Sequence, residues 1–170
     1  MKLRQNKGKG IKRMREDKRI RLYLDVCCLS RPFDDQSQDK VRLETEAIIG
    51  ILQRCENIEW ELVGSDIIKL EIEKNQDYVK KQKVLLLYKG IAEEIKYNAQ
   101  IRIRAAQLRE NGAKLLDSLH LASAEYAEVD VFLTTDARLL KFAVRSDLRI
   151  RIENPVNYYM EVLVNEQFGD

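Results

Sequence analysis

Short apolar segments that alternate with longer amphipathic ones constrain the fold of this chain more than any other feature. Candidate strands, recognised by their aliphatic and β-branched residues, are 20–26, 59–63, 129–133 and 149–152, with 94–97 as a weaker strand or a connector. Apolar residues recur at helical spacing in 40–55, 77–91, 98–110, 115–126 and 137–144. This alternation predicts a single three-layer α/β/α domain around a central, mostly parallel sheet.

Local signals set several element ends. Gly64 closes the second strand, and Ser65 is a suitable N-cap for a short helix that contains Glu71. Asn111-Gly112 ends the helix 98–110, and Pro155 suits the first turn of a final helix. Turn-forming residues in 30–36 interrupt the chain after the first strand.

The basic residues are concentrated at the N-terminus. Residues 1–21 hold ten of the 30 basic and two of the 28 acidic residues, so residues 22–170 carry a net charge of −6. The 170 residues suit one compact domain, and we divide them into a basic arm (1–19), a domain (20–165) and a short tail (166–170). The arm is either a disordered leader, which we favour, or a contact for phosphate backbones.

The composition also limits the cellular setting. The chain has neither the hydrophobic run of a secretory signal nor the ~20 apolar residues of a membrane span, so we expect a cytoplasmic protein without membrane association. Its three cysteines (Cys27, Cys28, Cys55) have no zinc-binding spacing, and we expect the adjacent pair to be buried in an apolar strand.

Acidic residues stand where an α/β fold places its chemistry. Asp25 ends the first strand and Asp136 follows the strand 129–133, while Glu71 and Asp117 lie near helix starts. In parallel sheets, ligands bind at the carboxyl ends of the strands. Converging carboxylates repel one another unless a cation neutralises them, and oxygen ligands suit Mg²⁺ or Mn²⁺. The pattern therefore predicts a metal site that hydrolyses phosphodiesters.

Each acid has a simpler interpretation beside this one. Asp25 could be a turn residue, Asp136 a helix N-cap, and Asp117 an acid favoured by the helix dipole. Glu71 competes with Glu73, Glu44 and Glu46 for the same role. The single histidine, His120, lies one turn after Asp117, and we expect it to support the site or the core.

Four short motifs resemble those of PIN-domain proteins, including VapC-type toxins of bacterial toxin–antitoxin pairs. In chain order they are Leu22-Tyr23-Leu24-Asp25, the segment Ser65–Glu71, the segment Leu116–Ala124 and Phe132-Leu133-Thr134-Thr135-Asp136. The resemblance covers roughly residues 20–165, and Ile150–Tyr158 is similar to the closing strand and helix of those toxins. It implies a PIN-like fold.

The resemblance also implies a function. It indicates an endoribonuclease that uses Mg²⁺ or Mn²⁺, with Asp25, Glu71, Asp117 and Asp136 as catalytic residues and metal ligands. Thr134 or Thr135 would orient a ligand or a water molecule. RNA is the implied substrate, a cognate antitoxin the implied partner, and a homodimer the implied assembly.

The chain departs from its relatives after the first aspartate. Val26 and Cys27 stand where many relatives have a small hydroxyl residue and Asn, so polar support of Asp25 is expected to be lost. The segment 31–36 suggests a distinct subgroup, and we expect Arg31, with residues such as 80–83 and 102–104, to supply a positive rim for RNA.

Three other functions compete with this one. A phosphatase of the haloacid-dehalogenase type needs a second Asp two residues after its nucleophile, where this chain has Cys27. A DNA-directed nuclease would use the same metal chemistry. A catalytically degenerate PIN-like module would bind RNA or a partner without cutting, and metal-dependent cleavage separates it from a nuclease.

Overall fold

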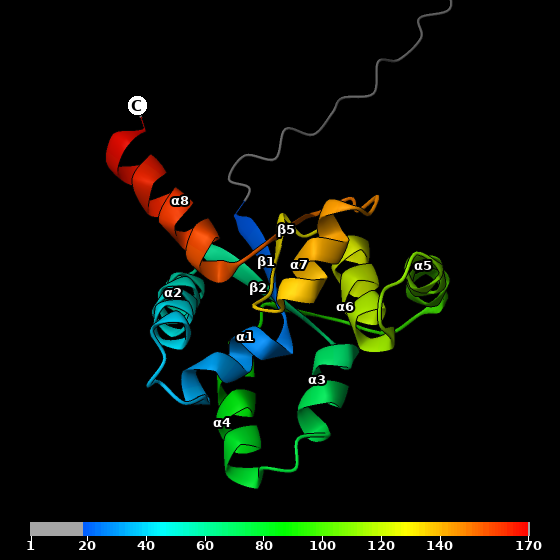
Figure 1. Cartoon of the computed structure of the whole chain (residues 1–170), viewed down its shortest axis with the longest axis horizontal. Helices are drawn as coiled ribbons and strands as arrows, with labels where there is room; N and C mark the ends of the chain where they lie inside the picture. Colours follow the sequence, from blue (N-terminus) through cyan, green and yellow to red (C-terminus); the bar gives the residue numbers. More distant parts are fainter. Residues whose placement is uncertain (1–18, 170) are drawn as a thin grey trace, which may run out of the picture.

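A parallel sheet of five strands forms the centre of the protein (Figure 1). The computed structural model describes residues 19–169. The strands are β1 (Ile20–Leu24), β2 (Trp60–Ser65), β3 (Glu93–Ile95), β4 (Val131–Leu133) and β5 (Arg151–Glu153). Their order is β3-β2-β1-β4-β5, and every neighbouring pair is parallel. The predicted α/β architecture is confirmed, and the weak candidate near residue 94 is a true strand.

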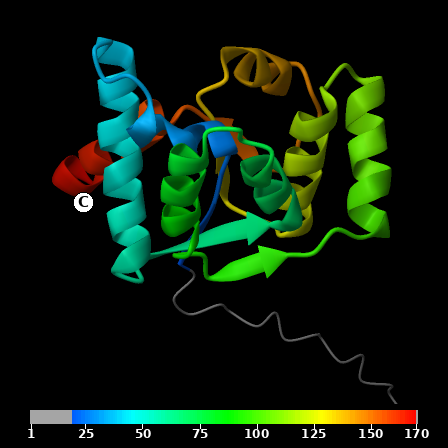
Figure 2. The same ribbon diagram turned by 90° about the horizontal axis from the view of Figure 1, so that it is seen from below.

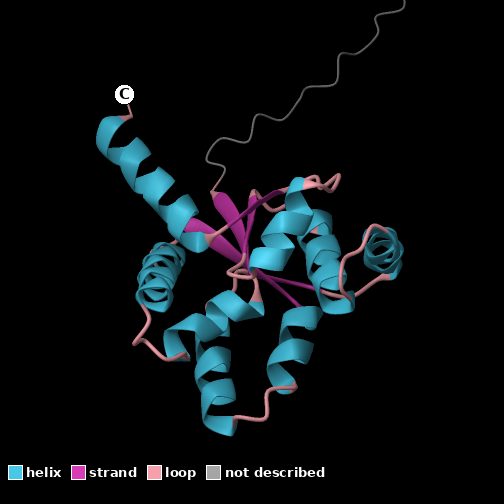
Figure 3. Cartoon of the chain, viewed as in Figure 1, coloured by secondary structure: helices cyan, strands magenta, loops and turns pink. Residues whose placement is uncertain are grey.

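Helices surround the sheet on both faces and at its carboxyl edge (Figure 3). They are α1 (Val26–Ser30), the 3₁₀ helix η1 (Arg31–Phe33), α2 (Asp39–Glu56), α3 (Asp66–Glu73), α4 (Tyr78–Tyr88), α5 (Ala99–Glu110), α6 (Leu115–Tyr126), α7 (Ala137–Val144) and α8 (Pro155–Phe168). Helices α2 and α8 pack together on one side, and α5 packs on α6 on the other (Figures 1 and 2). None of the described helices is long and apolar enough to cross a bilayer.

The central strand β1 anchors the core. Leu22, Tyr23 and Leu24 are fully buried, and the Tyr23 ring stacks on Phe132 of β4 with centroids 5.1 Å apart. Burying a side chain of this size contributes about 1.5–3 kcal/mol, so β1 is held firmly between its two neighbours. The carboxyl end of β1, where Asp25 lies, is consequently a rigid part of the protein.

Several predicted element ends coincide with the observed ones. The Ser65 hydroxyl accepts a hydrogen bond from the Ile68 backbone N–H and caps α3. Gly112 takes a positive φ of 101° just after α5, which is the conformation that favours glycine. Pro155 occupies the first turn of α8. The predicted basic arm lies outside the described residues except for Arg19.

The prediction that Cys27 and Cys28 belong to a strand is wrong. The chain turns at Asp25, whose carbonyl oxygen accepts hydrogen bonds from the backbone N–H groups of Cys28 and Leu29. This turn starts α1, so the cysteines are helical. A short apolar run has no period that distinguishes a strand from a buried helix, which is why the sequence pattern misled. Cys28 is buried, Cys27 is half-buried, and both are free thiols.

Candidate metal centre

Asp25 is a buried carboxylate at the centre of the sheet's carboxyl edge. Its backbone N–H donates to the Leu133 carbonyl of β4, and its side chain is only 8% exposed. The Asp25 side chain does not cap α1, so both carboxylate oxygens are directed elsewhere. Burying such a group without partners would be costly, and Asp25 therefore needs hydrogen bonds or a cation.

Thr134 supplies one of these hydrogen bonds. Its hydroxyl donates to Oδ2 of Asp25 at 2.8 Å, and its side chain is fully buried. The Cys27 thiol lies 3.2 Å from the same oxygen. Asp25 is thus supported although Val26 and Cys27 replace the polar residues of many PIN proteins. The threonine that follows β4 and the Cys27 thiol compensate for the expected loss of support.

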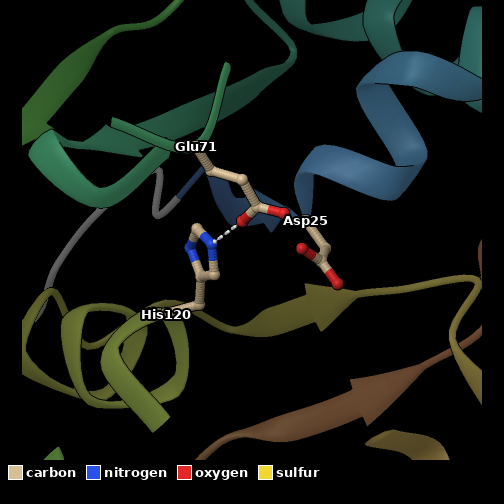
Figure 4. A group of neighbouring side chains, drawn as sticks. All are labelled: Asp25, Glu71 and His120. Atoms are coloured by element: carbon tan, nitrogen blue, oxygen red, sulfur yellow. Dashed lines mark hydrogen bonds and ion pairs between the residues drawn. The ribbon is translucent and has the colours of Figure 1, made fainter. Parts of the chain in front are cut away.

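Glu71 is the glutamate that faces Asp25 (Figure 4). Asp25, Glu71 and His120 each offer one ligand atom within 4.8 Å of the others. The competing glutamates lie elsewhere: Glu73 pairs with Lys81, and Glu44 is buried against Arg31. Glu46 is exposed on α2. Of the four glutamates among which the sequence did not decide, Glu71 is therefore the one that lies beside Asp25.

His120 holds Glu71 through a hydrogen bond at 2.6 Å between its Nε2 and Oε2 of Glu71. Its Nδ1 lies 2.8 Å from the hydroxyl of Tyr23. An ionised carboxylate only accepts, so Nε2 carries the proton, and in a neutral ring Nδ1 accepts from Tyr23. Burial raises the pKa of Tyr23 well above its ordinary value, so its hydroxyl keeps the proton to donate.

The chain of hydrogen bonds continues to the cap of α3. The Tyr23 hydroxyl lies 2.6 Å from Oγ of Ser65, the residue that caps the helix carrying Glu71. Tyr23, Ser65 and His120 are all buried. With both ring nitrogens engaged, His120 orients Glu71, in agreement with the supporting role expected for it. Tyr23 and Ser65 were not expected in this role, because nothing in their local sequence points to a histidine 97 or 55 residues away.

Asp117 and Asp136 border the same centre. The pKa of Asp117 is raised, first by burial and then by the negative charges of Asp25 and Asp136. These three carboxylates are therefore close enough to repel one another electrostatically. Asp136 also caps α7, because its Oδ1 accepts from the backbone N–H groups of Arg138 and Leu139. A helix cap and a metal ligand are compatible roles for one carboxylate, since capping uses only Oδ1 of Asp136.

The loop before Asp136 is held from two sides. The backbone N–H of Asp136 donates to Oγ1 of Thr134, and the Thr135 hydroxyl accepts from the Arg31 guanidinium at 2.9 Å. Arg31 also pairs with Asp34 and with buried Glu44. Arg31 thus lies beside the site, but three partners occupy its guanidinium, which makes it a brace between η1, α2 and the β4–α7 loop.

The side chains present suit a divalent cation. Asp25 and Glu71 offer carboxylate oxygens close to each other, and Asp117, whose pKa is raised by burial and then by Asp25 and Asp136, lies near them. Hard oxygen donors of this kind match Mg²⁺ or Mn²⁺. A hollow of about 240 Å³, lined in part by Cys27 and Glu71, opens beside Glu71. A small molecule or a phosphate group can therefore reach the Glu71 carboxylate.

The five-stranded parallel sheet and its covering helices are consistent with a PIN-like α/β/α fold. The sequence matches no known family and no characterised protein. Solved structures do match, among them a chain of VapBC2 from Rickettsia felis bound to a DNA fragment from their promoter, with a TM-score of 0.53 and 16% identity over 79% of this chain and 98% of that one.

Two further structures have the same relation to this chain. DNA-bound VapBC from Salmonella typhimurium gives a TM-score of 0.51 at 17% identity over 80% of this chain and 98% of that one. VapBC-1 from nontypeable Haemophilus influenzae gives a TM-score of 0.53 at 16% identity, with the same coverage of 80% and 98%. At this identity the likeness establishes the fold, and the PIN-like fold implied by the motifs is confirmed.

Proposed function

We propose that this protein is an endoribonuclease that depends on Mg²⁺ or Mn²⁺ and is the toxin of a toxin–antitoxin pair. The observation that carries the proposal is the close approach of Asp25 and Glu71 at the carboxyl edge of the sheet, with Asp117 and Asp136 near enough for the charges of Asp25 and Asp136 to raise the pKa of Asp117 in addition to burial. Among the described residues, no Ser/His/Asp or Cys/His set competes with these acids. A bound divalent cation would supply the positive charge that stabilises the phosphodiester's transition state and would lower the pKa of a water molecule.

The protein's own residues prepare this chemistry by fixing the carboxylates before substrate arrives. Asp25 is held by Thr134, and Glu71 is held by His120. Metal ligands whose orientation is set by hydrogen-bonded neighbours bind their ion more tightly, because less ordering remains to be done on binding. We assign Asp25, Glu71, Asp117 and Asp136 as ligands, with Thr134 and Thr135 as the residues that orient Asp25 and the Asp136 loop.

The partner and the assembly follow from the fold and the motifs together. The structural neighbours are VapBC structures, which supports a cognate antitoxin as the protein that inhibits this one. A homodimer in the cytoplasm is the proposed assembly and location. A DNA-directed nuclease is the second candidate, since the same carboxylates would cut either nucleic acid; the small size of the chain, without an insertion to grip DNA, favours RNA.

The proposal is tested by cleavage of a mixed RNA pool by protein freed of co-purified partners, with Mg²⁺, with Mn²⁺ and with a chelator. A DNA pool of matching sequence runs in parallel. The variants are Asp25→Asn and Glu71→Gln, and the control is Glu73→Gln, which makes the same chemical change two residues away on an exposed side chain. Binding of Mn²⁺ to each protein is measured by calorimetry.

We expect metal-dependent cutting of RNA by the wild type and by Glu73→Gln, and loss of both cutting and tight Mn²⁺ binding in the two site variants. Cutting that survives Asp25→Asn would refute the assignment of the site. Mn²⁺ binding without cutting of either pool would identify a degenerate binding module. Cutting of DNA alone would transfer the proposal to the second candidate.

A further inference from the structure

Helix α7 presents three cations on one face, next to the candidate metal centre. Arg138, Lys141 and Arg145 are separated by three and four residues, so they share a side of the helix. With Asn111, Phe142 and Ser146 they line a hollow of about 360 Å³, to which no acidic side chain contributes. We call Arg138, Lys141 and Arg145 the α7 strip.

The cations of the α7 strip differ from most others near the sheet in their lack of acidic partners. Arg54, Arg104 and Arg151 each have a carboxylate within 2.6 Å. Among the described residues, no carboxylate lies within ion-pair distance of Lys141 or Arg145, and the only ion-pair contact of Arg138 is with Asp136 at 3.8 Å. Lys141 and Arg145, the C-cap of α7, are four residues apart and repel each other, and a bound anion would relieve that repulsion.

The strip is continuous with the acidic centre. Asp136 caps the first turn of α7, and the strip then extends from Arg138 to Arg145 for about 10.5 Å at 1.5 Å per residue. Lys114 stands at the start of α6, close enough for its positive charge to oppose part of the rise in the pKa of Asp117. A polyanion bound with one phosphate at the carboxylates would therefore reach the strip within a few nucleotides.

We propose that the α7 strip binds the backbone of the RNA strand beside the phosphodiester that is cut. The inference rests on the proposed function and adds the surface that holds the substrate. Lys141 and Arg145 contact phosphates, and the half-buried ring of Phe142 forms an apolar wall of the hollow against which a base can lie. An acidic site cannot retain a polyanion without such positive neighbours.

Arg31, the residue that the sequence suggested for this task, is less suited to it. Its guanidinium is committed to Asp34, Glu44 and Thr135, and phosphate binding would have to break a pair with a buried carboxylate. Cations that are free in the folded protein bind phosphate without that cost.

The test compares the double variant Lys141→Gln/Arg145→Gln with a matched control, Lys89→Gln/Arg109→Gln, which removes the same charges from exposed positions at the end of α4 and in the last turn of α5. Binding of a fluorescently labelled, unstructured RNA is measured by anisotropy over a range of salt concentrations, with Ca²⁺ in place of Mg²⁺. Thermal unfolding verifies that each variant is folded. Cleavage by the wild type is measured separately with Mg²⁺ and Mn²⁺.

We expect the Kd of the α7 variant to rise about tenfold and the slope of log K against log salt to become shallower by about 1.4, the value for two lost phosphate contacts on a single strand. The control variant should keep both values. An α7 variant that binds like the wild type, or a control weakened equally, overturns the inference while the nuclease proposal stands. If the α7 variant loses binding as expected but the wild type cuts no RNA, the α7 strip is supported and the nuclease proposal is refuted. A wild type that binds no RNA overturns the strip.

Discussion

Substitution of Gly64 by alanine tests how closely β2 and α4 pack beneath the candidate site. Gly64 precedes Ser65, the cap of the helix that carries Glu71. A Cβ at position 64 would lie 2.7 Å from Cζ and 2.9 Å from Cε2 of Tyr88, and closer still to its hydroxyl oxygen. Tyr88 is 4% exposed and donates a hydrogen bond to the Ser65 carbonyl at 3.0 Å, so the ring cannot move without losing that bond.

The expected cost follows from two effects. Overpacking of a rigid core costs about 1–3 kcal/mol. Loss of the Tyr88 hydrogen bond adds about 1 kcal/mol. The total of about 2–4 kcal/mol would lower the melting temperature by about 2–4 °C for each kcal/mol in a protein of this size. Since the Ser65 hydroxyl is also hydrogen-bonded to the Tyr23 hydroxyl, part of the displacement should reach the hydrogen bonds that hold Glu71.

The assay is urea unfolding of Gly64→Ala beside Gly90→Ala, whose added Cβ would meet only the Leu87 carbonyl oxygen at 3.7 Å. The control should change the free energy of unfolding by less than about 1 kcal/mol. Tyr88→Phe removes the closest contact, so Gly64→Ala should cost less in that background than in the wild type. A Gly64→Ala protein as stable as the wild type, or an equal cost in both backgrounds, would refute the packing argument.

Three more outcomes are expected. Because the pKa of Asp117 is raised in the folded protein, its contribution to stability is present below about pH 3.9, the unfolded value, and is lost as pH rises through the folded pKa. Metal-free Asp117→Asn should therefore gain stability over the wild type as pH rises. Urea unfolding of the two proteins at several pH values measures this, and equal pH profiles would contradict it. Tyr23→Phe removes the hydrogen-bond donor to His120 and should weaken Mn²⁺ binding about tenfold in calorimetry. An unchanged affinity would show that the hydrogen bonds from Tyr23 through His120 do not position Glu71 for the metal. Glu44→Gln leaves Arg31 facing a neutral group and should lower the free energy of unfolding by about 3 kcal/mol. A loss below about 1 kcal/mol would show that the ion pair with Asp34 is enough to compensate the charge of Arg31.

The order of the elements was predictable because its signals are local. Strand and helix periods, the Ser65 cap, the Asn111-Gly112 end of α5 and Pro155 each act within a few residues. Helix α7 has the predicted bounds of 137–144. The position of acids at strand ends was also predictable, since all strands of a parallel sheet present their carboxyl ends at one edge. Together these signals predicted an α/β fold with an acidic edge, and the resemblance of four motifs implied that the fold is PIN-like.

The helical state of Cys27 and Cys28 was not readable, because the hydrogen bonds that turn the chain at Asp25 depend on the pairing of β1 with β4. The arrangement of β3 beside β2, and of β5 beside β4, is likewise a product of long-range pairing.

The sequence by itself determined the α/β alternation and the acidic residues that end its strands and begin its helices, because periodicity and capping are properties of neighbouring residues. Only the tertiary structure decided that Glu71 faces Asp25 and that His120 and Tyr23 hold it there. It also placed Arg138, Lys141 and Arg145 around one hollow, and within residues 19–169 it left no carboxylate at ion-pair distance from Lys141 or Arg145, whereas Arg31 pairs with Asp34 and Glu44. These relations join residues from different elements, and distances between such residues are set by how the elements pack, which no local pattern records.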